Sequence, residues 1–196
     1  MSRLLIAFFF TATLVAQSNK TMELPFNQIP QAEVAYSSGN IVKRMVDGLG
    51  YRYYWATEGL RAEDLAFKPS EDSRSAQQTL EHLYGLSEMI VDAAQNKPNV
   101  RPSTFSAESF AELREATLNN LEEASKALTG LTEQQIAALE VVFESNGKRT
   151  AFPFWNMLNG PLADALYHTG QIVSFRRVSG NPMNPKVNVF MGRNND

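Results

Sequence analysis

"ADALYHTGQIVSFRRVSGNP", residues 163–182, has the pattern of a helix that ends at Gly180 and Pro182. It contains His168, one of only two histidines in the chain, four residues after the carboxylate of Asp164. Positions four apart on a helix lie on one face, so both side chains can point at the same atom. Two questions follow: which helices surround this stretch, and whether its acid and its histidine bind a metal.

Apolar residues recur at three- and four-residue spacing in four segments, which predicts four substantial helices. We expect them at Gly39–Leu60, Ala76–Asn96, Ala107–Leu128 and Phe154–Ser179, the last with a kink or restart at Gly160–Pro161. An irregular crossover, "VVFESNGKRTAFPF", precedes the last helix. The predicted fold is all-α: a four-helix bundle with a long crossover before the last helix.

Local signals set the expected ends of these elements. Ser75 and Gln78 form a capping box before the second helix, and Ser106 is the expected N-cap of the third. Residues 60–75 are expected to form a loop around Pro69. A second capping box predicts a short helical turn within "LTEQQIAALE", and the crossover that follows is either a small hairpin or an extended connection.

The first helix is unusually rich in aromatic residues. Its predicted apolar face includes Ile41, Met45, Val46 and Leu49. Four further positions within one turn and a half are aromatic: Tyr51, Tyr53, Tyr54 and Trp55. Two interpretations stay open for them, packing in the core and lining of a pocket.

Composition excludes several classes of function. The 196 residues fit one domain, and the net charge of −3 comes without a basic stripe, so we expect no nucleic-acid partner. The chain has no cysteine, which excludes disulfides and a thiol nucleophile of its own.

The N-terminus has the features of a secretory signal. Arg3 precedes the apolar run "LLIAFFFTATLV", which is too short to span a membrane. We expect a signal peptide at 1–17, an N-terminal arm at 18–37, the bundle at 38–185 and a tail at 186–196. The predicted location is periplasmic or secreted, without stable membrane insertion after cleavage. A buried N-terminal helix or a membrane anchor is the alternative interpretation.

The only other histidine, His82, lies on the second helix in line with the apolar Leu86 and Met89. Facing helices of a bundle bring such side chains together in the interior. His82, Asp164 and His168 would bind one divalent metal and leave positions open for water or substrate. The competing interpretations are a hydrogen-bonded core histidine at position 82 and a simple acid–imidazole pair on the last helix.

Two stretches resemble the DinB/YfiT-like family of proposed metalloenzymes. "LRAEDLAFKPSEDSRSAQQTLEHLYG" is similar to a family signature in which "L-x-x-x-D-L-x-x-x-P" precedes a helix with a metal histidine. Residues 163–182 are similar to the closing helix, where "H-x-x-x-H" is followed by "R-G-Q". The resemblance covers about residues 38–185 and implies a four-helix bundle with a long crossover.

The resemblance also implies a ligand set. His82 falls on the family's first histidine and His168 on the second of the pair, whereas Asp164 stands where a histidine is usual. "T-G-Q" replaces "R-G-Q" at residues 169–171. The implied cofactor is one divalent ion, zinc, nickel or iron, with a donor set of two histidines and one carboxylate.

Two functions are therefore expected. The first is an exported metal-dependent hydrolase or thiol transferase that acts on a small molecule, with Tyr167 and Gln171 flanking the ligands as candidate partners. The alternative is a non-catalytic bundle with structural metal or none. Such a bundle would bind a small apolar ligand between first-helix aromatics or act as an interaction protein, and a homodimer is expected on this interpretation.

Overall fold

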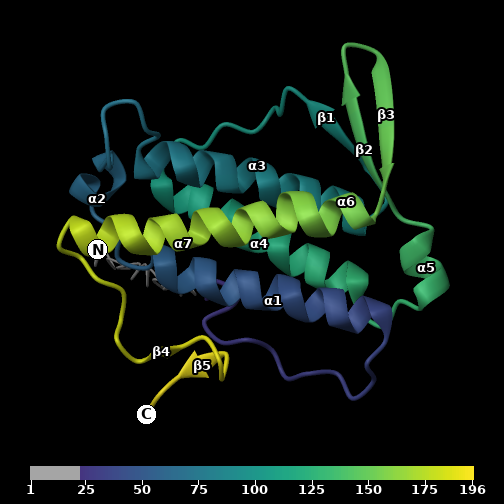
Figure 1. Ribbon diagram of the computed structural model, residues 1–196, viewed down its shortest axis with the longest axis horizontal. Helices are drawn as coiled ribbons and strands as arrows, with labels where there is room; N and C mark the ends of the chain where they lie inside the picture. Colours follow the sequence, from purple (N-terminus) through teal and green to yellow (C-terminus); the bar gives the residue numbers. More distant parts are fainter. Residues whose placement is uncertain (1–22) are drawn as a thin grey trace, which may run out of the picture.

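The structure is a computed structural model that describes residues 23–196. The predicted signal peptide, 1–17, and the start of the arm lie outside the described residues. Four long helices form the bundle (Figure 1): α1 Ser38–Thr57, α3 Ala76–Ala94, α4 Phe110–Leu128 and α7 Ala163–Val178. Both α4 and α7 pack against α1 and against α3, so the four helices form a closed square. The predicted bundle is confirmed.

The core lies between these helices and is built from one face of each. On α1 the buried stripe runs through Val42, Val46, Leu49 and Tyr53. Leu83, Leu86 and Ile90 of α3, Leu118, Leu121 and Leu128 of α4, and Ile172 of α7 complete it. Core packing is confirmed for Tyr51 and Tyr53, whereas Ile41 and Met45, predicted on the core face, are about half exposed. Val46 and Leu49, predicted on the same face, are buried, so the observed face includes Val42 in place of Ile41 and Met45.

The molecule is not purely all-α, because the segments between helices form a small sheet. Strands β1 Pro98–Arg101, β2 Glu140–Ser145 and β3 Lys148–Pro153 lie in the order β1-β2-β3. β1 and β2 are parallel, and β2 and β3 are antiparallel. Asn146 and Gly147 both have positive φ, which is the geometry of a two-residue hairpin turn. The crossover is thus a hairpin, and its pairing with β1 was not predicted.

Two of the connecting segments differ from expectation and one agrees. A short helix, α2 Ala62–Ala66, lies inside the predicted 60–75 loop. The third helix starts at Phe110 rather than Ala107, because the Ser109 hydroxyl, not that of Ser106, accepts the hydrogen bond from the N–H of Glu112. The predicted turn after α4 is present as α5 Glu133–Ala137 with its capping box.

The expected kink before α7 is present and fixes where that helix begins. A single turn, α6 Trp155–Met157, continues into the π-helical segment η1 Leu158–Leu162. Gly160 leaves helical geometry there (φ −96°, ψ −106°), and Pro161 has no N–H to continue the ladder. α7 therefore starts at residue 163, one position before Asp164.

The N-terminal arm and the C-terminal tail pack together against α1 (Figure 1). Phe26 is buried in the core, and the indole N–H of Trp55 donates to the carbonyl of Asn27. In the tail, β4 Val187–Asn188 pairs with β5 Arg193–Asn194, and the fully buried Tyr51 donates its hydroxyl to Asn194. No helix within residues 23–196 is long and apolar enough to cross a membrane.

Candidate metal site

The structure brings the three predicted ligands together between α3 and α7. One ligand atom from each of His82, Asp164 and His168 lies within 4.8 Å of the others. The Nε2 atom of His82 is 3.2 Å from Oδ2 of Asp164, and Nε2 of His168 is 3.4 Å from Oδ1 of the same carboxylate. The two imidazole rings meet edge to face, with centroids 4.8 Å apart.

Local structure explains this arrangement. Asp164 and His168 are one turn apart in α7, so they share a face. The kink at Gly160–Pro161 aims that face at α3, where His82 lies in the second turn. Packing of α3 against α7 then closes the distance between the two elements.

The spacing fits a small divalent ion. Donors that bind one metal at about 2.0–2.2 Å lie about 3.0–3.5 Å from one another in tetrahedral or octahedral geometry. The two nitrogen–oxygen separations at Asp164 fall in that range, each to a different oxygen of the carboxylate, and one donor atom from each of the three residues lies within 4.8 Å of the others. Two imidazoles and a carboxylate are also a donor set that suits iron or zinc.

Gln171 orients the ring of His168. Nδ1 of His168 lies 2.7 Å from the side-chain oxygen of Gln171, so this nitrogen carries the N–H of the bond. A neutral imidazole has a single N–H, which leaves Nε2 with a lone pair that faces the Asp164 carboxylate. A cation between these two atoms, or a second proton on the ring, removes that repulsion. Imidazole metal ligands commonly donate their other N–H to such an acceptor. The structure therefore places Gln171, named from the sequence as a candidate partner, in contact with His168.

The site is partly open to solvent. The side chain of His168 is 13% exposed, that of His82 32% and that of Asp164 42%. The ligands are thus held by buried helices but can be reached from outside. Tyr167 is 64% exposed, and its ring packs edge-on against His168.

An open groove of about 710 Å³ runs from this site. His82, Leu86 and Met89 of α3 form one side, and the segment from Asn156 to Tyr167 forms the other. The hairpin covers it with Val141, Phe143 and Phe152. None of the described lining residues comes from α1, so the expected lining by first-helix aromatics is wrong. The alternation of apolar residues in the hairpin was the available signal for its part in the groove.

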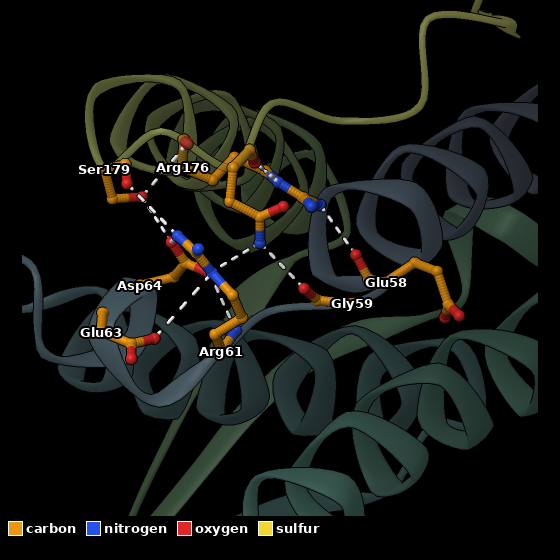
Figure 2. A network of polar contacts seen from close by, with 8 residues as sticks. Glu58, Gly59, Arg61, Glu63, Asp64, Arg176 and Ser179 are labelled. Carbon is orange, nitrogen blue, oxygen red and sulfur yellow. Dashed lines mark hydrogen bonds and ion pairs between the residues drawn. The ribbon is translucent and has the colours of Figure 1, made fainter.

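A polar network at the other end of α7 joins the two stretches that carry the family resemblance (Figure 2). The carboxylate of Asp64 accepts hydrogen bonds from the Arg61 guanidinium, from the Ser179 hydroxyl and from the Asn181 amide. The Arg61 guanidinium, supported by the other donors, holds the pKa of Asp64 well below its usual range. Asp64 of the first stretch is therefore a structural acid, not a metal ligand.

Arg176 completes this network at the end of α1. The residue is 4% exposed, and its guanidinium donates to the carbonyls of Trp55, Ala56 and Glu58. These carbonyls have no partner within the helix at its C-terminus, so Arg176 caps α1. Burial lowers the pKa of Arg176, although the arginine stays charged at neutral pH.

Comparisons with known proteins show the fold class. No family model matches the chain, and no curated protein gives a significant match. Among solved structures, the fold is that of the DinB-like proteins. The crystal structure of a DinB-like protein from Bacillus subtilis superimposes with a TM-score of 0.54 at 16% sequence identity. The match covers 76% of this chain and 99% of that one. At this identity the likeness establishes the fold and no more.

Proposed function

We propose that the protein is a metal-binding protein in which His82, Asp164 and His168 hold one divalent ion. The observation that carries this proposal is the pair of separations at Asp164, joined to the orientation that Gln171 gives His168. Zinc, nickel and iron are all compatible with these donors. The groove beside the ligands gives a small molecule access to the site.

The activity we propose is hydrolysis or thiol transfer on a small molecule. A divalent ion in such a site lowers the pKa of water or of a thiol and so supplies a nucleophile at neutral pH. The protein itself contributes the open face of the ligand set and the exposed phenol of Tyr167 at the edge of the groove. The chain has no cysteine, so the thiol in a transfer reaction must come from a co-substrate.

Metal content after purification without a histidine tag tests the proposed site. Protein stripped with chelator and reloaded with zinc, nickel or iron(II) should hold about one equivalent of an ion by mass spectrometry. His82→Ala and His168→Ala should each lose most of it, whereas Ser174→Ala, an exposed position on α7, should not. If wild type and His168→Ala contain equal amounts of metal, the proposed site is contradicted.

The apolar groove also favours a second candidate, a non-catalytic module that binds a small ligand. Turnover of an activated ester such as p-nitrophenyl acetate separates the two. Hydrolysis by metal-loaded protein that disappears in the metal-free protein and in His168→Ala favours an enzyme. Metal binding without turnover of esters or thiol-accepting electrophiles favours the module.

We also propose that the protein is exported, on the apolar run that follows Arg3 in the sequence. Expression of the full chain followed by mass determination of the product checks this. A mature N-terminus near residue 17 or 18 is the expected result, and an intact Met1 in the cytoplasmic fraction would contradict it.

A further inference from the structure

We infer that the groove takes a neutral, elongated small molecule with an apolar or aromatic body, and that it discriminates against anions. This inference rests on the proposed function, since it names the class of substrate that would reach the ligands. It is argued from the shape of the groove, from the character of its walls and from their charge.

The shape follows from two helical stripes. His82, Leu86 and Met89 are spaced by four and three residues, so they form one line along α3. The line spans seven residues, which is about 10 Å of helix. On the other side Asn156 lies about two turns before Asp164 in the kinked segment. A ligand that fills the groove is therefore about as long as two fused or linked rings.

The walls are mostly apolar. Leu86 and Met89 face the groove from α3, and the hairpin adds Phe143 and Phe152, whose rings meet edge to face with centroids 6.2 Å apart. Phe152 is 38% exposed. Aromatic side chains placed this way recognise an apolar or aromatic body.

Charge decides between neutral and anionic ligands. Among the described lining residues Asp164 is the only acid, and there is no lysine or arginine. The far end carries the amides of Asn156 and Asn159, which offer neutral donors and acceptors. A carboxylate or sulfonate held at this end of the groove, away from the proposed metal ion, would lose its hydration without gaining a cationic partner. An uncharged polar group can hydrogen-bond to both amides without the cost of desolvating a charge.

A matched pair of fluorescent probes tests the inference. N-phenyl-1-naphthylamine is neutral, and 1-anilinonaphthalene-8-sulfonate has the same rings with one sulfonate added. We expect the neutral probe to bind the metal-free protein saturably and at least tenfold more tightly than the sulfonate, which isolates the charge of the groove walls from that of a bound ion. In Asn159→Lys, which adds a cation to the far end, the sulfonate should gain affinity and close most of that gap.

Two bulky variants locate the binding. Ala163 is exposed and lines the groove, so Ala163→Phe should obstruct it beside Asp164 and weaken the binding of the neutral probe at least tenfold. Ser174→Phe adds the same ring at an exposed position of α7 outside the groove and should leave binding unchanged. Unchanged binding in Ala163→Phe, or equal affinity for both probes in wild type, would overturn the inference.

The design also separates this inference from the metal proposal. Ala163→Phe should keep its metal while it loses the probe, and His168→Ala should lose its metal while it keeps the probe. If Ala163→Phe still binds the probe, only the inference about the groove is contradicted. If His168→Ala keeps its metal, the proposed metal site is contradicted, and the conclusion drawn from probe binding is unaffected.

Discussion

The side chain of Gln171 determines which nitrogen of His168 faces Asp164. Its oxygen accepts from Nδ1 at 2.7 Å and so turns the lone pair of Nε2 toward the carboxylate. In the proposed metal site, that orientation leaves Nε2 of His168 available to bind the ion. Removing the Gln171 oxygen should let the His168 ring rotate while leaving the three proposed ligand side chains unchanged.

Gln171→Leu is therefore expected to weaken metal affinity by about 10- to 100-fold, the usual effect of losing a partner of a metal-bound histidine. Gln171→Glu keeps an acceptor at the same place and should stay close to wild type. Competition with a chromophoric chelator measures both. If the leucine variant binds as tightly as wild type, Gln171 does not orient His168.

At the scale of residues, spacing predicted which three side chains meet but not which residues surround them. The four-residue separation of Asp164 and His168 fixes their common face in any helix, and the apolar neighbours of His82 place it toward the bundle. Which of Tyr167 and Gln171 hydrogen-bonds to His168 depends on side-chain rotamers, which the sequence pattern does not determine. The predicted departure from the family pattern, aspartate for histidine, is compatible with the observed distances.

At the scale of elements, the start of α4 offers a clean test, because two serines compete for the N-cap. Ser109→Ala removes the acceptor for the N–H of Glu112 and should lower the free energy of unfolding by about 1 kcal/mol. Ser106→Ala, at the position predicted from the sequence, should change it little. Chemical denaturation of both variants measures the difference, and equal effects would contradict the observed cap.

Strand β1, which the sequence analysis missed, is held by non-local contacts. It begins at Pro98, just past the expected end of the second helix, and Pro98 pairs with Val142 more than forty positions later. The register of such a parallel pair has no signature in a single short segment. Capping boxes at Ser75 and Thr132 were predicted because their two partners lie three residues apart.

At the scale of the whole molecule, the Asp64 network ties α2 to the end of α7 (Figure 2). Its donors come from residues 115 and 117 positions away as well as from the adjacent Arg61. The resemblance marked these stretches, but only the fold shows that Asp64, Ser179 and Asn181 meet. The arm and the tail are a similar case, because Phe26 completes the core from a segment expected to be an arm outside the bundle.

Asp64→Asn should therefore destabilise the whole bundle, by about 2–3 kcal/mol near neutral pH, because charged hydrogen bonds to a nearly fully buried oxygen pair are lost. Since the folded pKa of Asp64 is lowered, this contribution is complete above the unfolded value of 3.8 and is lost as the pH falls below it. The gap in unfolding free energy between wild type and variant should stay constant from pH 7 to pH 5 and narrow below pH 4. Asp72→Asn, an exposed acid of the neighbouring loop, serves as the control and should show no such gap. Denaturant titrations across this range measure it, and a gap as wide at pH 3 as at pH 7 would show that the charge of Asp64 is not what stabilises the fold.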